Sequence, residues 1–470
     1  MSLNATDPVR ENPDEPDPAR MHHADPDMVQ HILALVSERV MEAEVPLDGL
    51  ADREHLAAAL EGLMTETGRD FREVLAIYQD DLAPTVLSAD SPRMFSFVPS
   101  APTKASLLFD MVVSAASLQG ISWLEAAGAV MAENQALRVL SDLVGLPPES
   151  GGVFVSGGSA ANLSALVVAR DTMRRRRGEA GLPDTPLRVV VSDQAHSSIA
   201  NSLSITMMSA LVVSTLDTDG VLTGAAIRRS LADDADPTDI CAVVATTGTT
   251  NAGIIDDVAS VGDVARDLGW WLHVDGAYGG AGILSERVRE RFAGIEQADS
   301  VVMDPHKWWF APFDAAALLY REPHLAAAVH AQDASYLDVI HGQDINPSDL
   351  AHHLTRRARG LPLWFSLAVN GISAYRDAVD RGIELADYAA RRLAERPDCD
   401  LIRDPDLSIV LFRRRGWGAH EYALWSRDLL QTQRAFVTSS RWRGEVVGRL
   451  VFLHPATTEA MIDEAIDALG

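Results

Sequence analysis

Short, fully apolar runs recur between residues 153 and 320 and alternate with stretches of helical periodicity. An apolar run without polar alternation predicts a strand buried on both faces, and strands separated by helices predict a mostly parallel sheet. In such sheets, ligands bind beyond the carboxyl ends of the strands, so the residues that follow each run are candidates for function. The predicted strands are Val153–Val155, Arg188–Ser192, Ala210–Ser214, Ile240–Ala245, Trp270–Val274, Ser300–Met303 and Ala315–Tyr320.

The segments around this predicted sheet suggest three further parts of the chain. Residues 1–24 are rich in Asp, Glu and Pro and predict a flexible leader without the apolar segment of a signal peptide. Residues 25–105 carry helical patterns whose apolar face has no core of its own, which predicts a dimerisation segment. Residues 106–360 are then the large α/β domain, and 361–470 a small α+β domain. Its expected elements are a helix over 361–391, strands near 408–412, 434–438 and 449–454, and a helix over 457–469.

The charge and composition exclude several classes of partner. A formal net charge of −27 argues against nucleic acid or an anionic membrane surface. No run of 18 apolar residues is present, so no membrane-spanning helix is expected. The two cysteines, Cys241 and Cys399, lie far apart in the sequence, which favours a reducing cytoplasm over a disulfide scaffold.

One lysine stands out because the chain has only two, Lys104 and Lys307, while almost every other basic residue is arginine. Lys307 lies between His306 and Trp308, in apolar surroundings where a charged amine is costly to desolvate. Lysine forms a Schiff base once burial or neighbouring groups lower its pKa, whereas arginine cannot. The alternative is a surface lysine whose stem lies along the protein.

The segment Ser156–Asn162 follows the first predicted strand and opens a helix. Its glycines allow close approach of an anion to free N–H groups at a helix N-terminus, which predicts a phosphate site. An ordinary strand-to-helix turn is the alternative. The segment is neither a P-loop nor a dinucleotide fingerprint.

Two further side chains follow predicted strands of the same sheet. Asp275 ends one strand and precedes the small residues Gly276 and Ala277, and a buried carboxylate there needs a partner such as a protonated ring nitrogen. His196 follows another strand and could stack on a ring or relay a proton. In isolation, Asp275 also fits the role of an aspartate that caps a turn, and His196 that of a packed imidazole. Together with the lysine and the glycine loop, they form the set needed to hold pyridoxal 5′-phosphate.

These motifs resemble those of the pyridoxal-phosphate-dependent amino acid decarboxylases, the group that includes aromatic-L-amino-acid, glutamate, histidine and 2,4-diaminobutyrate decarboxylases. The similarity runs from Ser91-Pro92 to the final helix. It implies a fold type I, aspartate-aminotransferase-like architecture with a seven-stranded sheet, and a homodimer with active sites at the subunit interface. The most specific motifs are His273–Tyr278, Asp304–Trp308 with Phe313-Asp314, and Leu354–Arg359 before Leu363-Trp364.

The resemblance implies roles for the cofactor-binding residues, and it implies no metal. Lys307 would be the Schiff-base lysine, Asp275 would pair with the pyridine nitrogen, and His306 would assist around the lysine. Two residues, Ala277 and His196, would contact opposite faces of the ring. Four others would lie near the phosphate or the ring, namely Gly158, Ser159, Ser300 and Thr249. Asp304 stands where several relatives have asparagine close to the phosphate.

The resemblance also bears on the product and the substrate. Tyr336 matches a loop tyrosine that protonates the substrate carbon after CO2 has left, which favours an amine product over an aldehyde. The residues expected to line the substrate pocket are Ala89, Val98, Gln119, Ile121 and Thr355. The expected function is therefore decarboxylation of an L-amino acid, with aromatic amino acids as first candidates. The alternatives are a 2,4-diaminobutyrate or glutamate type of substrate, an aldehyde-forming oxidative decarboxylase, and an inactive regulatory dimer.

Overall fold

The structure is a computed structural model that describes residues 17–99, 101–182, 184–234, 237–332 and 346–470. The chain forms two compact units, one with residues up to 43 together with 51–85, and one with residues 44–50 together with 86–470. The domain boundaries predicted after residues 24, 105 and 360 stay predictions. Tyr336 lies outside the described residues.

The first unit consists of short helices with aspartate caps. Asp25, Asp52 and Asp70 each accept backbone N–H groups from the first turn of the helix that follows, which satisfies donors that lack an intrahelical partner. Among the residues described in α1, α2 and α3, none is buried. The elements are η1 (Arg20–His22), α1 (Pro26–Met41), α2 (Arg53–Leu60), α3 (Phe71–Ile77), η2 (Tyr78–Leu82) and η3 (Ala83–Thr85).

In the part of the chain that the structure describes, seven strands form the central sheet of the second unit, in the order β1-β7-β6-β5-β4-β2-β3. β7 runs antiparallel to both of its neighbours, and the other pairs are parallel. The predicted mostly parallel sheet is therefore confirmed. The strands are β1 (Gly151–Val155), β2 (Arg188–Ser192), β3 (Ser209–Val213), β4 (Ile240–Thr246), β5 (Trp271–Asp275), β6 (Ser300–Met303) and β7 (Ala316–Tyr320).

Helices cover both faces of this sheet, which is why its strands read as continuous apolar runs. Val153 and Val155 pack with α6, α7 and α10 on one face, whereas Phe154 between them packs with α5, α8, α9 and α11 on the other. This alternation is that of successive side chains along a strand. The helices are α4 (Lys104–Ala115), α5 (Trp123–Val144), α6 (Gly158–Glu179), α7 (Ser197–Ile205), α8 (Gly224–Ala232), α9 (Val258–Leu268), α10 (Pro323–His330) and α11 (Leu361–Ala394).

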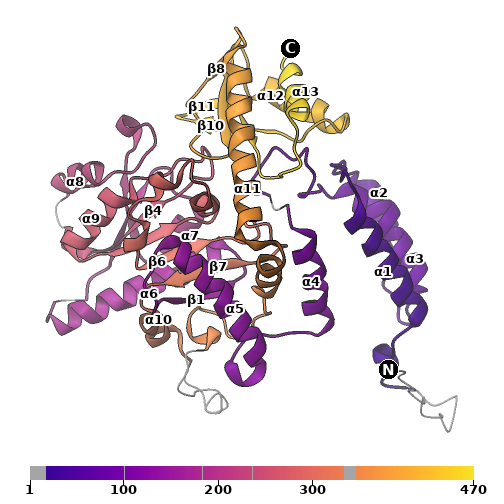
Figure 1. Cartoon of the computed structure of the whole chain (residues 1–470), viewed down its shortest axis with the longest axis horizontal. Coiled ribbons are helices and arrows are strands. Elements are labelled where there is room, and N and C mark those ends of the chain that lie inside the picture. The colour runs from indigo at the N-terminus through magenta and orange to yellow at the C-terminus, as the bar shows by residue number, and fades with distance from the viewer. Residues whose placement is uncertain (1–16, 100, 183, 235–236, 333–345) are drawn as a thin grey trace. The chain divides into compact units, whose positions relative to one another are not determined.

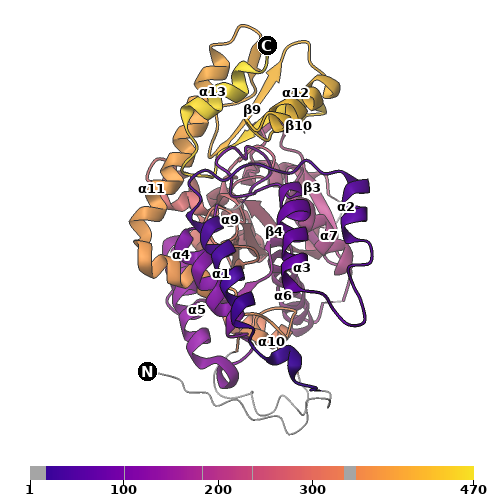
Figure 2. The same cartoon turned by 90° about the vertical axis from the view of Figure 1, so that its right-hand side faces the viewer.

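The chain continues from α11 into a four-stranded antiparallel sheet in the order β10-β11-β9-β8, which Figure 1 shows beside the end of that helix. In Figure 2 the elements of this small domain gather at the end of the molecule that holds the C-terminus. The apolar pattern missed β8 and α12, and the strand predicted at 434–438 lies four residues later. The elements are β8 (Cys399–Leu401), β9 (Ile409–Arg414), α12 (Ala419–Gln431), β10 (Thr438–Trp442), β11 (Glu445–Val451) and α13 (Glu459–Asp467).

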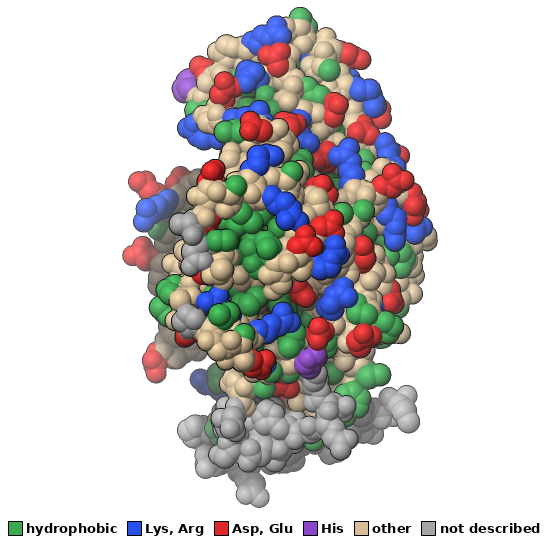
Figure 3. Space-filling view, turned by 90° about the vertical axis from the view of Figure 1, so that its left-hand side faces the viewer, with side chains coloured by type: hydrophobic (Ala, Val, Ile, Leu, Met, Phe, Trp, Pro, Cys, Tyr) green, Lys and Arg blue, Asp and Glu red, His purple; other side chains and the backbone are tan. Residues whose placement is uncertain are grey.

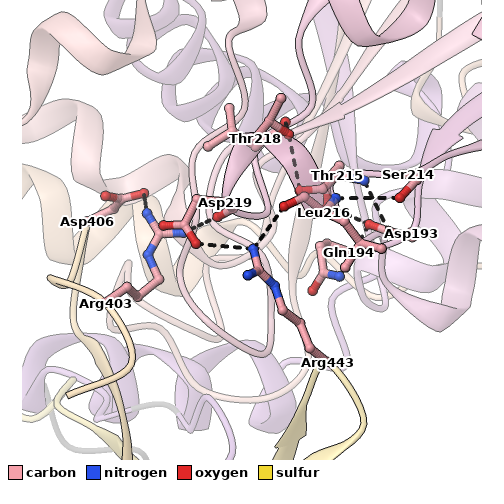
Figure 4. Close-up of polar contacts among 11 residues, drawn as sticks. Asp193, Gln194, Ser214, Thr215, Leu216, Thr218, Asp219, Arg403, Asp406 and Arg443 are labelled. Atoms are coloured by element: carbon pink, nitrogen blue, oxygen red, sulfur yellow. Dashed lines mark hydrogen bonds and ion pairs between the residues drawn. The ribbon is translucent and has the colours of Figure 1, made fainter. Parts of the chain in front are cut away.

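A polar network fixes the small domain to the turn that follows β3 (Figure 4). Arg443 donates to the Leu216 carbonyl at 3.2 Å and pairs with Asp219 at 3.3 Å. Arg403 donates to the Asp219 carbonyl at 3.0 Å and pairs with Asp406 at 3.2 Å. These contacts hold the small domain against the sheet domain near the strand ends.

The charge of the surface and the hydropathy of the helices agree with what the composition predicts. On the face drawn in Figure 3, acidic and basic side chains are interspersed. Among the described residues, no helix is long and apolar enough to cross a membrane.

Candidate active site

A cavity of about 400 Å³ lies at the carboxyl ends of the central strands. The turns after β1, β2, β4, β5 and β6 all contribute to it, as the sheet rule predicts. Its lining brings together eight of the residues singled out in the sequence. They are Gly158, Ser159, His196, Asp275, Ala277, Asp304, His306 and Lys307.

Lys307 forms an ion pair inside this cavity. Its Nζ lies 2.8 Å from the Asp304 carboxylate, whose side chain is 1% exposed. Burial lowers the pKa of Lys307, but the charge and hydrogen bond of Asp304, together with the charge of Asp275, outweigh burial and leave the pKa raised. The structure therefore places the lysine where predicted, but it does not show the lowered pKa expected from the sequence.

The glycine loop has no room for larger side chains. A Cβ atom on Gly158 would lie 2.9 Å from the Asp304 carboxylate and 3.2 Å from the Ala277 methyl group. A Cβ on Gly276 would lie 2.9 Å from both the Thr247 hydroxyl and the Val302 carbonyl. Glycine at these two positions therefore keeps the turns after β1 and β5 in close contact around the cavity.

A buried chain of hydrogen bonds leads to Asp275, and its direction follows from that carboxylate, which accepts. The Asn162 amide nitrogen therefore faces Asp275, and the amide oxygen accepts from His273 Nε2 at 2.9 Å. Burial lowers the pKa of His273 to about 4, so its ring is neutral and its Nδ1 accepts from the Ser300 hydroxyl at 2.8 Å. The Ser300 oxygen accepts in turn from the indole N–H of Trp271 at 2.8 Å.

The Asn162 amide nitrogen has two acceptors. It donates to Asp275 Oδ2 at 2.9 Å and to the Ser198 hydroxyl at 3.0 Å. The Ala277 N–H donates to the other Asp275 oxygen at 3.1 Å. Two neutral donors thus stabilise the carboxylate without cancelling its charge, which stays available for a cationic ring nitrogen.

His196 receives its orientation from the same amide. The Ser198 hydroxyl, which accepts from Asn162, lies 2.8 Å from His196 Nδ1, and the Ser198 N–H donates to the same nitrogen at 3.2 Å. Nδ1 is therefore an acceptor, and the proton of the neutral ring lies on Nε2. Asn162 consequently links the two groups predicted to contact the cofactor ring.

His306 is held by the turn that carries the lysine. Its Nδ1 accepts the Ala315 N–H at 3.0 Å, and its ring packs against Phe313 with centroids 5.0 Å apart. Burial lowers its pKa although Asp304 opposes this, with Nε2 3.6 Å from the carboxylate.

The structure does not bring two of the predicted cofactor residues to the cavity. Ser300 is fully buried, and its hydroxyl is engaged by Trp271 and His273. It begins β6, so at about 3.3 Å per residue it lies roughly 10 Å from the carboxyl end of the strand. Thr249 is also buried, and its hydroxyl accepts the Ile254 N–H at 3.1 Å inside a turn.

The residues predicted for the substrate pocket lie away from this cavity. None of Ala89, Val98, Gln119, Ile121 and Thr355 is among the described residues that line it. Gln119 pairs with Arg357 in an isolated β-bridge and lines a separate hollow of about 700 Å³ with Phe109 and Trp364. Tyr336, outside the described residues, has no position here.

Several lining residues had no role assigned from the sequence. Thr246 ends β4, Gly248 and Thr250 follow it, and Tyr278 follows β5. Asn162 is the last residue of the glycine segment noted in the sequence, and Ser198 lies two residues after His196. Their positions shortly after a predicted strand were the available signal. Only the folded structure shows that both belong to one network.

The donor set fits pyridoxal 5′-phosphate. It combines an amine at Lys307, a carboxyl group at Asp275 and the glycine loop at the N-terminus of α6. One buried oxygen of a lining residue, Asp304 Oδ1, has no hydrogen-bond partner within the described chain. Such an atom is expected next to a polar ligand.

Comparison with known proteins decides the family. Residues 54–415 match the model of the pyridoxal-dependent decarboxylase conserved domain, which is well over half of the chain. The protein belongs to the pyridoxal-dependent decarboxylase family. It is a carboxy-lyase that uses pyridoxal 5′-phosphate to decarboxylate an amino acid.

Individual relatives place this decarboxylase among enzymes with different substrates. It is 30% identical over 433 residues to an aromatic-L-amino-acid decarboxylase of Bacillus atrophaeus, covering 88% of each chain. It is 31% identical over 378 residues to an L-2,4-diaminobutyrate decarboxylase of Rhizobium meliloti, covering 78% of this chain and 74% of the relative. Among solved structures, Oryza sativa TDC with PLP and tryptamine is similar with a TM-score of 0.85 and 25% identity, covering 97% of this chain and 98% of the other.

The cofactor supplies an electron-accepting pyridinium ring, on which the electrons of the broken carbon–carboxylate bond are stabilised. Residues of the cavity would hold this ring. Asp275, which accepts from Asn162 and from the Ala277 N–H, would face the ring nitrogen, and His196 and Ala277, which line the cavity, would contact the ring. Lys307 would supply the amine for covalent attachment.

Proposed function

We propose that the enzyme converts an L-amino acid to the corresponding amine and CO2, with aromatic amino acids as first candidates. The observation that carries the reaction type is the cavity that joins Lys307 to the buried Asp275 carboxylate, which accepts two neutral donors, in a chain whose residues 54–415 match the decarboxylase domain. Support for an aromatic substrate is the aromatic-L-amino-acid decarboxylase matched over 88% of both chains. The diaminobutyrate relative at 31% identity keeps that class as the alternative.

One of the proposed substrate residues, Ile121, contacts the described residues that follow Tyr336 in the sequence. The Trp123 N–H donates to the Asn346 side chain at 2.8 Å, and the Ser348 N–H donates to the Ile121 carbonyl at 3.2 Å. Gly120 is held in turn by Arg356, whose guanidinium pairs with Glu133 at 2.8 Å. The contact between Ile121 and Ser348 supports Ile121 as a part of the proposed substrate pocket.

A substrate panel tests the proposed function. Purified enzyme is assayed with the common L-amino acids, ornithine and 2,4-diaminobutyrate, and both CO2 and amine are measured. Aromatic substrates are expected to give the highest kcat/KM, with one amine formed per CO2. A preference for 2,4-diaminobutyrate or glutamate would replace the proposed substrate class and leave the reaction type intact.

Replacing Tyr336 with phenylalanine tests the proposed proton donor. We expect amine formation to fall by roughly 100-fold, because a positioned general acid contributes about 10²–10⁴-fold. Aldehyde, peroxide and ammonia are expected to rise instead, since the aldehyde-forming route lacks this protonation. Products are quantified per CO2 released under air and under nitrogen. An unchanged amine yield would remove Tyr336 from the reaction.

We also propose a homodimer whose interface completes the active sites. Large apolar side chains stay exposed on α4 and α5, with Leu108 49%, Leu124 64% and Met131 57% accessible. Apolar surface of this kind on neighbouring helices is typical of a protein interface. Sedimentation equilibrium is expected to give twice the 50.7 kDa chain mass, and Leu124→Glu to favour the monomer. A fully active monomer would contradict the shared sites.

The compartment proposed is the cytoplasm. Both cysteines, Cys241 and Cys399, are buried and free, which fits a reducing environment.

A further inference from the structure

A carboxylate lies inside the part of the site that is suited to an anion. The N–H of Gly158, at the start of the 22-residue helix α6, donates to Asp304 Oδ2 at 3.2 Å. The glycine loop and the helix N-terminus would attract a phosphate group there. A phosphate bound there would therefore share the Gly158 N–H with the Asp304 carboxylate.

The second oxygen of Asp304 gives separate support for a ligand group beside this carboxylate. Oδ1 is buried and has no hydrogen-bond partner, while the whole side chain is 1% exposed and borders the cavity. A buried carboxylate oxygen without a donor is costly. A hydrogen between this oxygen and a phosphate oxygen would satisfy both groups.

The charges that face Asp304 come from each element packed around it. Lys307 Nζ lies at 2.8 Å and His306 Nε2 at 3.6 Å, both in the turn after β6. From the turn after β5, Ala277 accepts the Asp304 N–H through its carbonyl, and Asp275 adds a negative charge that also acts on Lys307. From α6, the Gly158 N–H is a neutral donor. Two carboxylates thus face one ammonium group.

A bound phosphate would add negative charge to the surroundings of Asp304. A phosphate monoester carries about −1.5 to −2 charges near neutral pH. When two anionic groups share a small site, one of them retains a proton to well above its ordinary pH range. His306 does not supply the missing charge, because burial lowers its pKa and its Nδ1 already accepts the Ala315 N–H.

We propose that Asp304 and the cofactor phosphate share one proton in the loaded enzyme, so that cofactor binding takes up a proton through Asp304. The shared proton occupies the space beside Oδ1 and replaces repulsion between two anions with a hydrogen bond. Cofactor retention then weakens as the pH rises, because the deprotonated pair is repulsive. This inference rests on the cofactor of the family and not on the substrate proposed above.

Phosphorus-31 NMR of the loaded wild-type enzyme tests the shared proton directly. We expect the resonance of the bound phosphate to move with pH between about 7 and 9, a range in which a free phosphate monoester is already a dianion. In the isosteric Asp304→Asn enzyme the resonance is expected to stay constant over this range. A wild-type resonance fixed at the dianion position would overturn the proposal without any variant.

Binding of 4′-deoxypyridoxine 5′-phosphate to cofactor-stripped enzyme gives a second measurement. This probe carries the phosphate but has no aldehyde, so it cannot react with Lys307. Its Kd for wild type is expected to rise about tenfold per pH unit above pH 7.5, as the linkage to one proton requires. For Asp304→Asn we expect a flat profile and roughly tenfold tighter binding near pH 8.5.

Asp314→Asn is the matched control for this experiment. Asp314 influences His306 and pairs with Arg359, but its side chain is 44% exposed and lies outside the cavity lining. The control is expected to keep the wild-type slope. The proposal fails if Asp304→Asn keeps that slope, or if Asp314→Asn loses it to the same extent. Neither outcome depends on which amino acid is decarboxylated.

Discussion

Replacing Lys307 with alanine is expected to abolish amine formation, with kcat at least about 10³-fold lower, because proton transfer alone contributes about 10²–10⁴-fold. Among the described residues that line the cavity, Lys307 has the only side-chain amine that can attach the cofactor covalently, and the variant loses it. Two quantities are measured. One is the absorbance at about 420 nm, which is typical of the cofactor bound to a lysine, and the other is CO2 release. Borohydride reduction of wild type should then fix the cofactor on the peptide that contains Lys307.

Two controls separate the covalent role of Lys307 from its charge. Lys104→Ala removes the chain's other lysine, which is exposed at the start of α4, and should change neither absorbance nor turnover. Lys307→Arg preserves a cation for Asp304 but cannot form the covalent link, so it should be as inactive as the alanine variant. If either Lys307 variant retains both the absorbance band and turnover, the site is assigned to the wrong residue.

Asp275→Asn is expected to lower kcat by roughly 100-fold or more, because loss of one charged partner of a buried pair costs about 2–5 kcal/mol. The asparagine is nearly isosteric but cannot stabilise a protonated ring nitrogen. A cofactor analogue methylated at the ring nitrogen carries a permanent positive charge and should restore part of the lost rate in this variant only. The measurement is single-turnover CO2 release with each cofactor.

Asp299→Asn is the control for this variant. Asp299 is also a largely buried acid at the end of a strand, and it accepts the Leu272 N–H at 2.7 Å, but it lies at the opposite end of β5 and β6 from the cavity. We expect its replacement to leave the cofactor response unchanged. Equal rates for wild type and Asp275→Asn would show that the carboxylate does not act on the ring.

The sequence predicted the sheet well because its strands are buried on both faces. Seven apolar runs became seven strands among the described residues, with ends shifted by no more than two residues at most positions. The small domain was harder to predict. In β10 the burial alternates between half-buried and exposed residues, and the pattern over Thr438–Trp442 is too polar to mark a strand. Sheet pairing with β11 forms it instead.

The sequence by itself determined which residues would line the site, because each one lies at or after the end of a strand and the carboxyl ends of parallel strands meet at one edge. Lys307, Asp275, His196 and Gly158 were all accessible to that reasoning. The tertiary structure alone decided which groups contact one another. It placed Ser300 roughly 10 Å from the strand end, at about 3.3 Å per residue, and gave the hydrogen-bond chain through Asn162 its direction. It also set Asp304 against Gly158 and Lys307, because hydrogen bonds and ion pairs depend on distances that residue spacing does not encode.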